Sequence, residues 1–212
     1  MEKVLVVGAN GQTGTEIVKI LKNHGQYDPI AMIRKESQKS KFDELGIDSR
    51  LGDLEQDLSE TVNGIDKIIF AAGSGASTGP EKTIAIDQEG AKKLIDEASS
   101  HKVKKFVMLS SMGADKPESH EELKQYLEAK HNADEYLKNS GLNYTIVRPG
   151  QLTNEDHDGH IAAREHFSES GKISREDVAQ VLVCALDHAS VKNRTFEILN
   201  GEQTIQEALA EL

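Results

Sequence analysis

The stretch that decides the fold stands near the start of the chain and runs Lys3-Val4-Leu5-Val6-Val7-Gly8-Ala9-Asn10-Gly11-Gln12-Thr13-Gly14. Its first part, Lys3–Val7, is a continuous apolar and largely β-branched run, which is typical of a strand covered on both faces. After the glycines, Thr13–His24 carries apolar side chains at helical spacing and predicts an amphipathic helix. A strand, a glycine-rich turn and a helix in this order predict a backbone that holds phosphate groups.

The three glycines have different expected roles. Gly8 permits the tight turn out of the strand, Gly11 lets a pyrophosphate approach the backbone, and Gly14 lets the helix pack closely on the strand. The first turn of the helix then offers free N–H groups and the positive end of its dipole to the phosphates. The alternative is a glycine-rich turn without a ligand, and the position between a strand and a helix argues against it.

The alternation of strand and helix continues through the first 150 residues. Further strands are expected over Ile30–Ile33, Ile47–Leu51, Lys67–Phe70, Lys105–Leu109 and Tyr144–Val147. Helices are expected over Gln38–Leu45, Thr83–His101 and His120–Ser140. This alternation predicts an α/β fold in which a doubly wound, mainly parallel sheet carries helices on both faces.

The pattern changes after Pro149. The segment Gly150–Gly171 is polar and shows no clear period, so residues 150–172 are expected to form a loop-rich lid or a small C-terminal substrate lobe. The length of 212 residues suits a single domain that includes this lobe.

Two helix starts and one strand are expected beyond this segment. Ser174-Arg175-Glu176-Asp177 resembles a capping box and opens a helix that is expected to reach Leu186. Thr195–Leu199 predicts a last strand. Thr204-Ile205-Gln206-Glu207 is a capping box for a terminal helix.

Charge and composition argue against several classes of protein. The 25 basic and 36 acidic residues give a net charge of −11, and such a surface repels the phosphate backbone of nucleic acids. The longest uncharged stretch, Ile68–Pro80, is interrupted by glycine, serine and threonine, so no membrane span is expected. Met1-Glu2-Lys3 leads directly into the first strand without a charged leader, so a cytoplasmic protein is expected.

No metal site is expected from the cysteine and histidine positions. Cys184 is the single cysteine, which excludes an internal disulfide and a cysteine-based zinc site. His157, His160 and His166 lie among acidic residues, but their spacing fits no helical i, i+4 pair. The alternative for these histidines is that one of them faces a substrate.

The phosphate-binding loop suits a nicotinamide dinucleotide, and the end of the second strand indicates whether NAD or NADP is preferred. A site that prefers NAD usually has an acidic residue at the end of this strand, whereas Met32-Ile33-Arg34-Lys35 contains none. A guanidinium group binds phosphate oxygens in a forked geometry, so Arg34 suits the 2′-phosphate of NADP. The alternative is a solvated basic pair, in which case NAD remains possible. Asp53 follows the third strand. We expect its carboxylate either to lie near the adenine amino group of the cofactor or to cap the segment that follows.

A second group of residues suits proton transfer. Ser110 and Ser111 follow the fifth strand, and Tyr126 and Lys130 stand at i and i+4 on one face of the next helix. An ammonium group beside a tyrosine favours the phenolate form, so the tyrosine can act as a general acid or base. A serine hydroxyl beside it can hold a substrate carbonyl or alcohol. Together with a nicotinamide, these groups suffice for hydride transfer with coupled proton transfer.

These motifs resemble the short-chain dehydrogenase/reductase superfamily, and in particular its atypical NAD(P)-binding, NmrA-like and epimerase/dehydratase-like branch. The resemblance covers essentially the whole chain and implies a Rossmann-type fold. It rests on Gly8-x-x-Gly11-x-x-Gly14, Asp53-Leu54, Ala71-Ala72-Gly73, Ser110-Ser111, Tyr126-x-x-x-Lys130 and Tyr144-Thr145-Ile146-Val147-Arg148-Pro149-Gly150.

The resemblance also implies roles for single residues. The implied cofactor contacts are Gly8, Asn10, Gly11, Gln12, Thr13, Gly14, Arg34, Asp53, Leu54, Ala71, Ala72, Gly73, Lys130, Pro149 and Gly150. Tyr126 is implied as the acid or base, Ser111 as the hydroxyl that polarises the substrate, and Lys130 as the group that binds the nicotinamide ribose. One departure is Asp87, which stands where extended members of the superfamily commonly carry asparagine.

Three functions follow as hypotheses. The first is an NADP-dependent oxidoreductase that acts on a small carbonyl or alcohol, as a monomer or a homodimer. The second is a non-catalytic NADP(H)-binding redox sensor. The third is a sugar epimerase or dehydratase, which the 62 residues beyond Gly150 disfavour, because members that bind nucleotide sugars add a domain of roughly a hundred residues.

Overall fold

The computed structural model of the chain describes residues 1–75, 79–156 and 158–212. Within these residues, the central sheet has nine strands in the order β3-β2-β1-β4-β5-β6-β10-β8-β11. Seven of them pair in parallel, β8 pairs antiparallel with β10 at one side, and β11 pairs antiparallel with β8. The strands are β1 (Glu2–Val7), β2 (Tyr27–Ile33), β3 (Asp48–Leu51), β4 (Lys67–Phe70), β5 (Lys105–Leu109), β6 (Tyr144–Pro149), β8 (His160–Arg164), β10 (Arg194–Asn200) and β11 (Gln203–Thr204).

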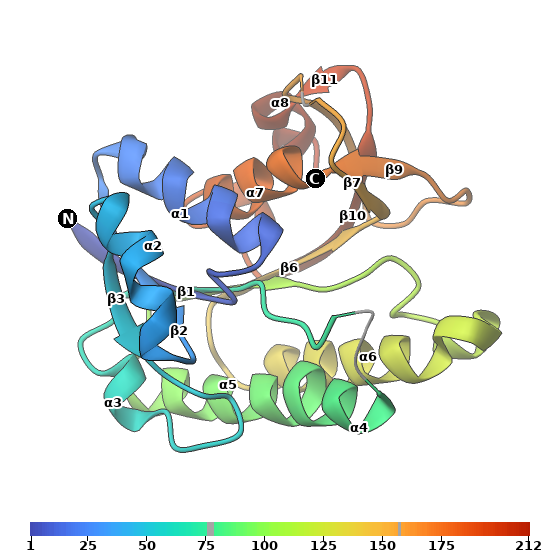
Figure 1. Cartoon of the computed structure of the whole chain (residues 1–212). Coiled ribbons are helices and arrows are strands. Elements are labelled where there is room, and N and C mark those ends of the chain that lie inside the picture. Colours follow the sequence, from blue (N-terminus) through green and yellow to red (C-terminus); the bar gives the residue numbers. More distant parts are fainter. Residues whose placement is uncertain (76–78, 157) are drawn as a thin grey trace.

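Helices cover both faces of this sheet (Figure 1). One face carries α1 (Gln12–His24), α2 (Lys39–Glu44), α7 (Arg175–Cys184) and α8 (Ile205–Ala210). The other carries α3 (Ser59–Val62), α4 (Pro80–Thr83), α5 (Ala91–Ser100) and α6 (Lys124–Lys138). The predicted doubly wound α/β fold of the Rossmann type is therefore confirmed.

The apolar run of β1 shows why the sheet is buried on both sides. Val4 and Val6 pack into the core beneath α1 and α7, whereas Leu5 and Val7 pack into the core beneath α5 and α6. All four side chains are buried. Because alternate residues of a strand point to opposite faces, a continuous apolar run is what a strand between two helix layers requires.

The position of β1 fixes the location of a ligand site. β1 pairs with β2 on one side and with β4 on the other, and Val4 lies opposite both Pro29 and Lys67. The connections that leave β1 and β3 therefore run to opposite halves of the sheet. In open parallel sheets, ligands bind at the carboxyl ends of the strands at such a switch point, and Gly8–Gly14 begins there.

The segment after Pro149 is more regular than predicted. It contains β8, which extends the central sheet beside β10, and β7 (Gln151–Thr153), which pairs with β9 (Lys172–Ser174). These strands have three to five residues and are partly exposed, so they carry no apolar alternation that a sequence pattern reveals. The expectation of a loop-rich lid or small lobe named no strands in this segment. Its role as a lid stays a prediction.

Two helices differ from their predicted bounds or geometry. The helix expected over Thr83–His101 starts at Pro80 and contains a π-helical turn over Ile84–Gly90. The helix expected from His120 begins at Lys124, after a 3₁₀ turn. The capping box of Thr204 and Glu207 is present, and Ser174 caps α7 by accepting the N–H of Asp177.

None of the helices in the described parts of the chain is both long and apolar enough to cross a lipid bilayer.

Candidate functional site

The glycine loop after β1 is shaped partly by the packing of the chain itself. Gly8 has a φ of +88°, and a Cβ at this position would lie 2.6 Å from the backbone of Ala71. A Cβ at Gly14 would lie 2.1 Å from the carbonyl oxygen of Gly8. The first and third glycines are therefore required for the turn and for the close approach of α1 to the loop.

Gly11 is different, because the chain leaves more room around it. A Cβ at Gly11 would meet the carbonyl oxygen of Gly8 at 3.3 Å, which is tight but not excluded. Gly11 is also the N-cap of α1, and no side chain among the described residues caps this helix end. The first-turn N–H groups of α1 therefore lack a side-chain acceptor, which suits an anionic ligand.

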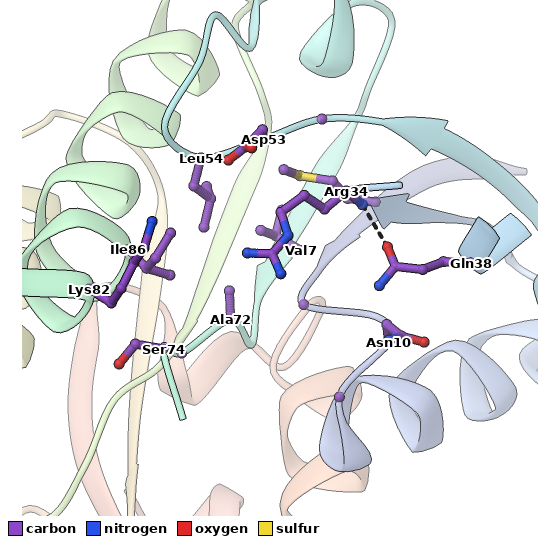
Figure 2. A pocket seen from close by; sticks show the side chains of 15 residues that line it. Val7, Asn10, Arg34, Gln38, Asp53, Leu54, Ala72, Ser74, Lys82 and Ile86 are labelled. Atoms are coloured by element: carbon purple, nitrogen blue, oxygen red, sulfur yellow. Dashed lines mark hydrogen bonds between the residues drawn. The ribbon is translucent and has the colours of Figure 1, made fainter. Parts of the chain in front are cut away.

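A cavity of about 420 Å³ lies on one side of the loop, at the ends of β1, β2 and β3. Figure 2 shows the Arg34 guanidinium group pointing into it. The backbone N–H of Arg34 donates to Oε1 of Gln38 at 2.8 Å, which fixes the end of β2. The lining residues are Val7, Gly8, Asn10, Gly11, Met32, Arg34, Gln38, Gly52, Asp53, Leu54, Ala72, Gly73, Ser74, Lys82 and Ile86.

The Asp53 side chain lines the first cavity and also accepts a hydrogen bond from the backbone. Its Oδ1 accepts the N–H of Glu55 at 3.0 Å, so the interpretation as a cap of the following segment is confirmed. The neighbouring Leu54 is buried and lies against Gly90, where a Cβ would be 2.7 Å from that of Leu54. Asp53 and Leu54 therefore form a fixed wall of the cavity.

A second cavity, of about 650 Å³, lies on the other side of the loop. It shares Gly11, Ala72, Gly73 and Ser74 with the first cavity, so the two meet at the glycine loop and the end of β4. Its other lining residues are Gln12, Thr13, Gly14, Ala71, Gly75, Pro80, Thr83, Leu109, Ser110, Glu122, Leu123, Gln125, Tyr126, Lys130, Leu152 and Arg175. Together the two cavities form a trough that runs from Arg34 to Tyr126.

Lys130 is held in this second cavity by a buried ion pair. Its Nζ lies 2.9 Å from Oδ1 of Asp87 and 3.4 Å from the carbonyl oxygen of Leu109. Asp87 is fully buried in the π-helical turn, and its Oδ2 accepts the N–H of Ser74. Burial by itself lowers the pKa of Lys130, but Asp87, with Tyr126 and Asp134, outweighs burial and raises that pKa above its ordinary value. Lys130 is thus a fixed cation.

Tyr126 lies beside this cation at the start of α6. Its side chain is half-buried, and the centre of its ring is 5.7 Å from Nζ of Lys130. The i, i+4 spacing on one helix thus brings both residues to the same cavity, as predicted.

The serine that borders the cavity is Ser110, and Ser111 is not among the lining residues. Ser110 Oγ donates to Oδ2 of Asp134 at 2.8 Å, and Arg148 donates to the same oxygen from Nε and Nη2. Ser111 Oγ instead donates to the carbonyl oxygen of Met112 at 3.2 Å. Burial raises the pKa of the Asp134 carboxyl despite its contact with Arg148.

Pro149 and Gly150 also lie outside the lining of both cavities. A Cβ at Gly150 would lie 2.4 Å from the carbonyl oxygen of Gly171 and 2.5 Å from the Leu199 side chain. The packing of β6 against β9 and β10 therefore explains this glycine without a ligand.

Of the three histidines considered as metal ligands, the two that the structure describes have different partners. His157 lies outside the described residues. Nδ1 of His160 contacts Asp158, whereas Nδ1 of His166 lies 3.3 Å from Oε1 of the buried Glu197. The expectation of no bound metal stays a prediction.

The fold and this trough define a Rossmann-type protein whose site fits a nicotinamide dinucleotide. A family model described as NAD(P)H-binding matches residues 8–189, and the chain belongs to this family. This match confirms the resemblance to the atypical short-chain dehydrogenases/reductases.

Individual relatives are similar over nearly their whole length. An uncharacterized sugar epimerase, YhfK from Bacillus subtilis (strain 168), is 42% identical over 99% of this chain and 100% of its own. A solved structure from Bacillus halodurans, provisionally named an NAD-dependent epimerase/dehydratase, is 43% identical with a TM-score of 0.96, and the match covers 100% of both chains. Sanguinarine reductase from Eschscholzia californica is 29% identical over 97% of this chain and 91% of its own.

Proposed function

We propose that the chain is an NADP(H)-dependent oxidoreductase that acts on a small carbonyl or alcohol substrate. The observation that carries this proposal is the trough, in which a cavity that contains Arg34 meets a cavity that contains Tyr126 at the glycine loop. A bound nicotinamide cofactor supplies the hydride in reduction and accepts it in oxidation.

The first cavity suits the adenosine end of the cofactor. Arg34 is exposed, and no carboxylate among the described residues pairs with its guanidinium group, which leaves it available to a 2′-phosphate. Asp53, Leu54 and Met32 line the remaining walls. This arrangement supports NADP over NAD.

The second cavity suits the reacting centre. We assign to Tyr126 the proton that reaches the substrate oxygen in reduction and returns in oxidation. The fixed charge of Lys130 stabilises the negative charge that develops on the Tyr126 oxygen. Since the ion pair with Asp87 holds Lys130 in its charged form, this lysine keeps its proton during turnover, and its role is electrostatic.

The substrate-facing hydroxyl is assigned to Ser110 in place of Ser111. The proton of Ser110 is directed at Asp134, whose Oδ2 also receives two bonds from Arg148. The oxygen of Ser110 is therefore oriented to accept a hydrogen bond, so it would orient a hydroxyl or N–H group of the substrate.

The names of the relatives support a reaction with hydride transfer, but they name two different types of reaction. Sanguinarine reductase is named for a reduction, whereas the two Bacillus proteins are named for epimerase-type reactions. An epimerase regenerates its cofactor within each turnover, whereas an oxidoreductase consumes NADPH. Net consumption of NADPH with a panel of small aldehydes, ketones and enones would therefore favour the oxidoreductase.

Replacement of Arg34 by alanine tests the preference for NADP. Calorimetric titration is expected to show a roughly tenfold to hundredfold higher Kd for NADPH, because charge-assisted hydrogen bonds to the 2′-phosphate are lost, and little change for NADH. Lys35→Ala is the matched control, since it removes an adjacent exposed cation that does not line the cavity. Equal losses for NADPH and NADH would contradict the assignment.

A further inference from the structure

A third cavity adjoins the glycine loop, on the side of α7. It has a volume of about 430 Å³ and shares Gly11 and Gln12 with the cavity that contains Tyr126. Arg175 lines both cavities. The other lining residues of the third cavity are Asn10, Thr15, Glu16, Lys41, Thr153, Asn154, Glu155 and Glu176.

The backbone of Arg175 is held firmly at this position. Arg175 is the first residue of α7, and the preceding Ser174 caps the helix by accepting the N–H of Asp177 at 3.0 Å. The side chain is half-buried, and Nη1 donates to Oδ1 of Asn154 at 2.7 Å. The capped start of α7 therefore places Arg175 at the junction of the two cavities.

The charge of Arg175 is not neutralised by the residues that the structure describes. Its hydrogen-bond partner is a neutral amide oxygen, and although Glu16, Glu155 and Glu176 line the same cavity, none of them forms an ion pair with it. A half-buried guanidinium group that pairs only with an amide retains donors for an anion.

The other cation of the Tyr126 cavity is already paired. Lys130 lies 2.9 Å from Asp87, so among the described lysines and arginines that line this cavity, Arg175 carries the uncompensated charge. An uncompensated guanidinium group in the lining of this cavity suits an anionic ligand.

We propose that Arg175 binds an anionic group, a phosphate or a carboxylate, at the junction of the glycine loop and α7. The inference rests on the proposed function. Gly11 and Gln12 border both cavities that contain Arg175, which favours the diphosphate of the cofactor as the bound group. A carboxylate of the substrate is the other source of the same chemistry.

The experiment compares Arg175→Gln with the wild-type chain by calorimetric titration. The probes are NADPH, ADP-ribose 2′-phosphate, which contains the diphosphate, and adenosine 2′-monophosphate, which lacks it. The variant is expected to raise the Kd of the first two probes roughly tenfold to a hundredfold and to leave the third unchanged. Sodium benzoate, titrated into the NADPH-saturated protein, serves as the carboxylate probe.

Controls separate the outcomes. Arg194→Gln removes the same charge from an exposed arginine that pairs with Glu165, and Arg175→Lys should restore part of the affinity. Thermal unfolding of each variant checks the fold. If NADPH binding is unchanged but benzoate binding is lost, the anion belongs to the substrate. If neither changes, the proposal is overturned. A wild-type chain that binds neither NADPH nor NADH would overturn the proposed function as well.

Discussion

Replacement of Tyr126 by phenylalanine is expected to lower kcat by a factor of about 100 to 10,000, which is the usual contribution of a positioned general acid or base. The Kd for NADPH should stay close to that of the wild-type chain. The phenol lies in the second cavity beside Lys130, whereas the residues assigned to the adenosine end line the first. The substitution removes only the oxygen that carries the proton.

The measurement is the initial rate of NADPH oxidation with whichever small carbonyl the wild-type chain reduces. Tyr136→Phe is a matched control on the same helix, since the Tyr136 hydroxyl donates to Asp96 on the exposed side of α6. Turnover of the Tyr126 variant at the wild-type rate would remove this residue from the mechanism.

Replacement of Asp87 by alanine is expected to lower the free energy of unfolding by about 3–5 kcal/mol, because it leaves the Lys130 ammonium buried without its carboxylate. Both side chains are almost inaccessible to solvent, with exposures of 4% for Lys130 and 0% for Asp87. Water therefore cannot replace the lost partner.

The effect of this substitution should depend on pH. In the wild-type chain the pKa of Lys130 is raised, so the ion pair contributes fully below the pKa of an unfolded lysine, about 10.4, and is lost only above the folded value. In the variant, the Asp87 carboxylate no longer opposes burial, so the pKa of Lys130 is lower than in the wild-type chain. The destabilisation should therefore shrink as the pH rises from 7 to 9.

Denaturant unfolding at several pH values tests this expectation. Glu89→Ala is the control, because Glu89 forms a partly exposed i, i+3 pair with Lys92 whose loss should change stability by less than about 1 kcal/mol. The double variant Asp87→Leu/Lys130→Met should recover much of the loss. A single Asp87 variant as stable as the wild-type chain would mean that the ion pair does not hold Lys130.

The centre of the sheet could be predicted because its inner strands, above all β1, β4 and β5, are buried on both faces and therefore carry apolar runs. β8 could not, because it is short and partly polar and lies between β10 and the two-residue edge strand β11. The π-helical turn that places Asp87 also leaves no mark in the hydrophobic pattern, since it adds one residue to a turn of an otherwise ordinary helix.

The candidate site was predictable where local spacing determines geometry. The glycine loop follows a strand, and Tyr126 and Lys130 share a helix face, so both arrangements follow from distances along the chain. The choice between Ser110 and Ser111 depends on which residue after β5 turns toward the cavity. Arg175 reaches the glycine loop from α7, far away in the sequence, and only the fold brings them together.

The most direct test of the account is a calorimetric titration of the wild-type chain with NADPH, NADP⁺, NADH and NAD⁺. We predict one molecule of NADPH bound per chain, with a Kd roughly tenfold or more below that of NADH, as expected for charge-assisted bonds to a 2′-phosphate. No binding of any of the four forms would contradict it, because the trough between Arg34 and Tyr126 would then have another occupant.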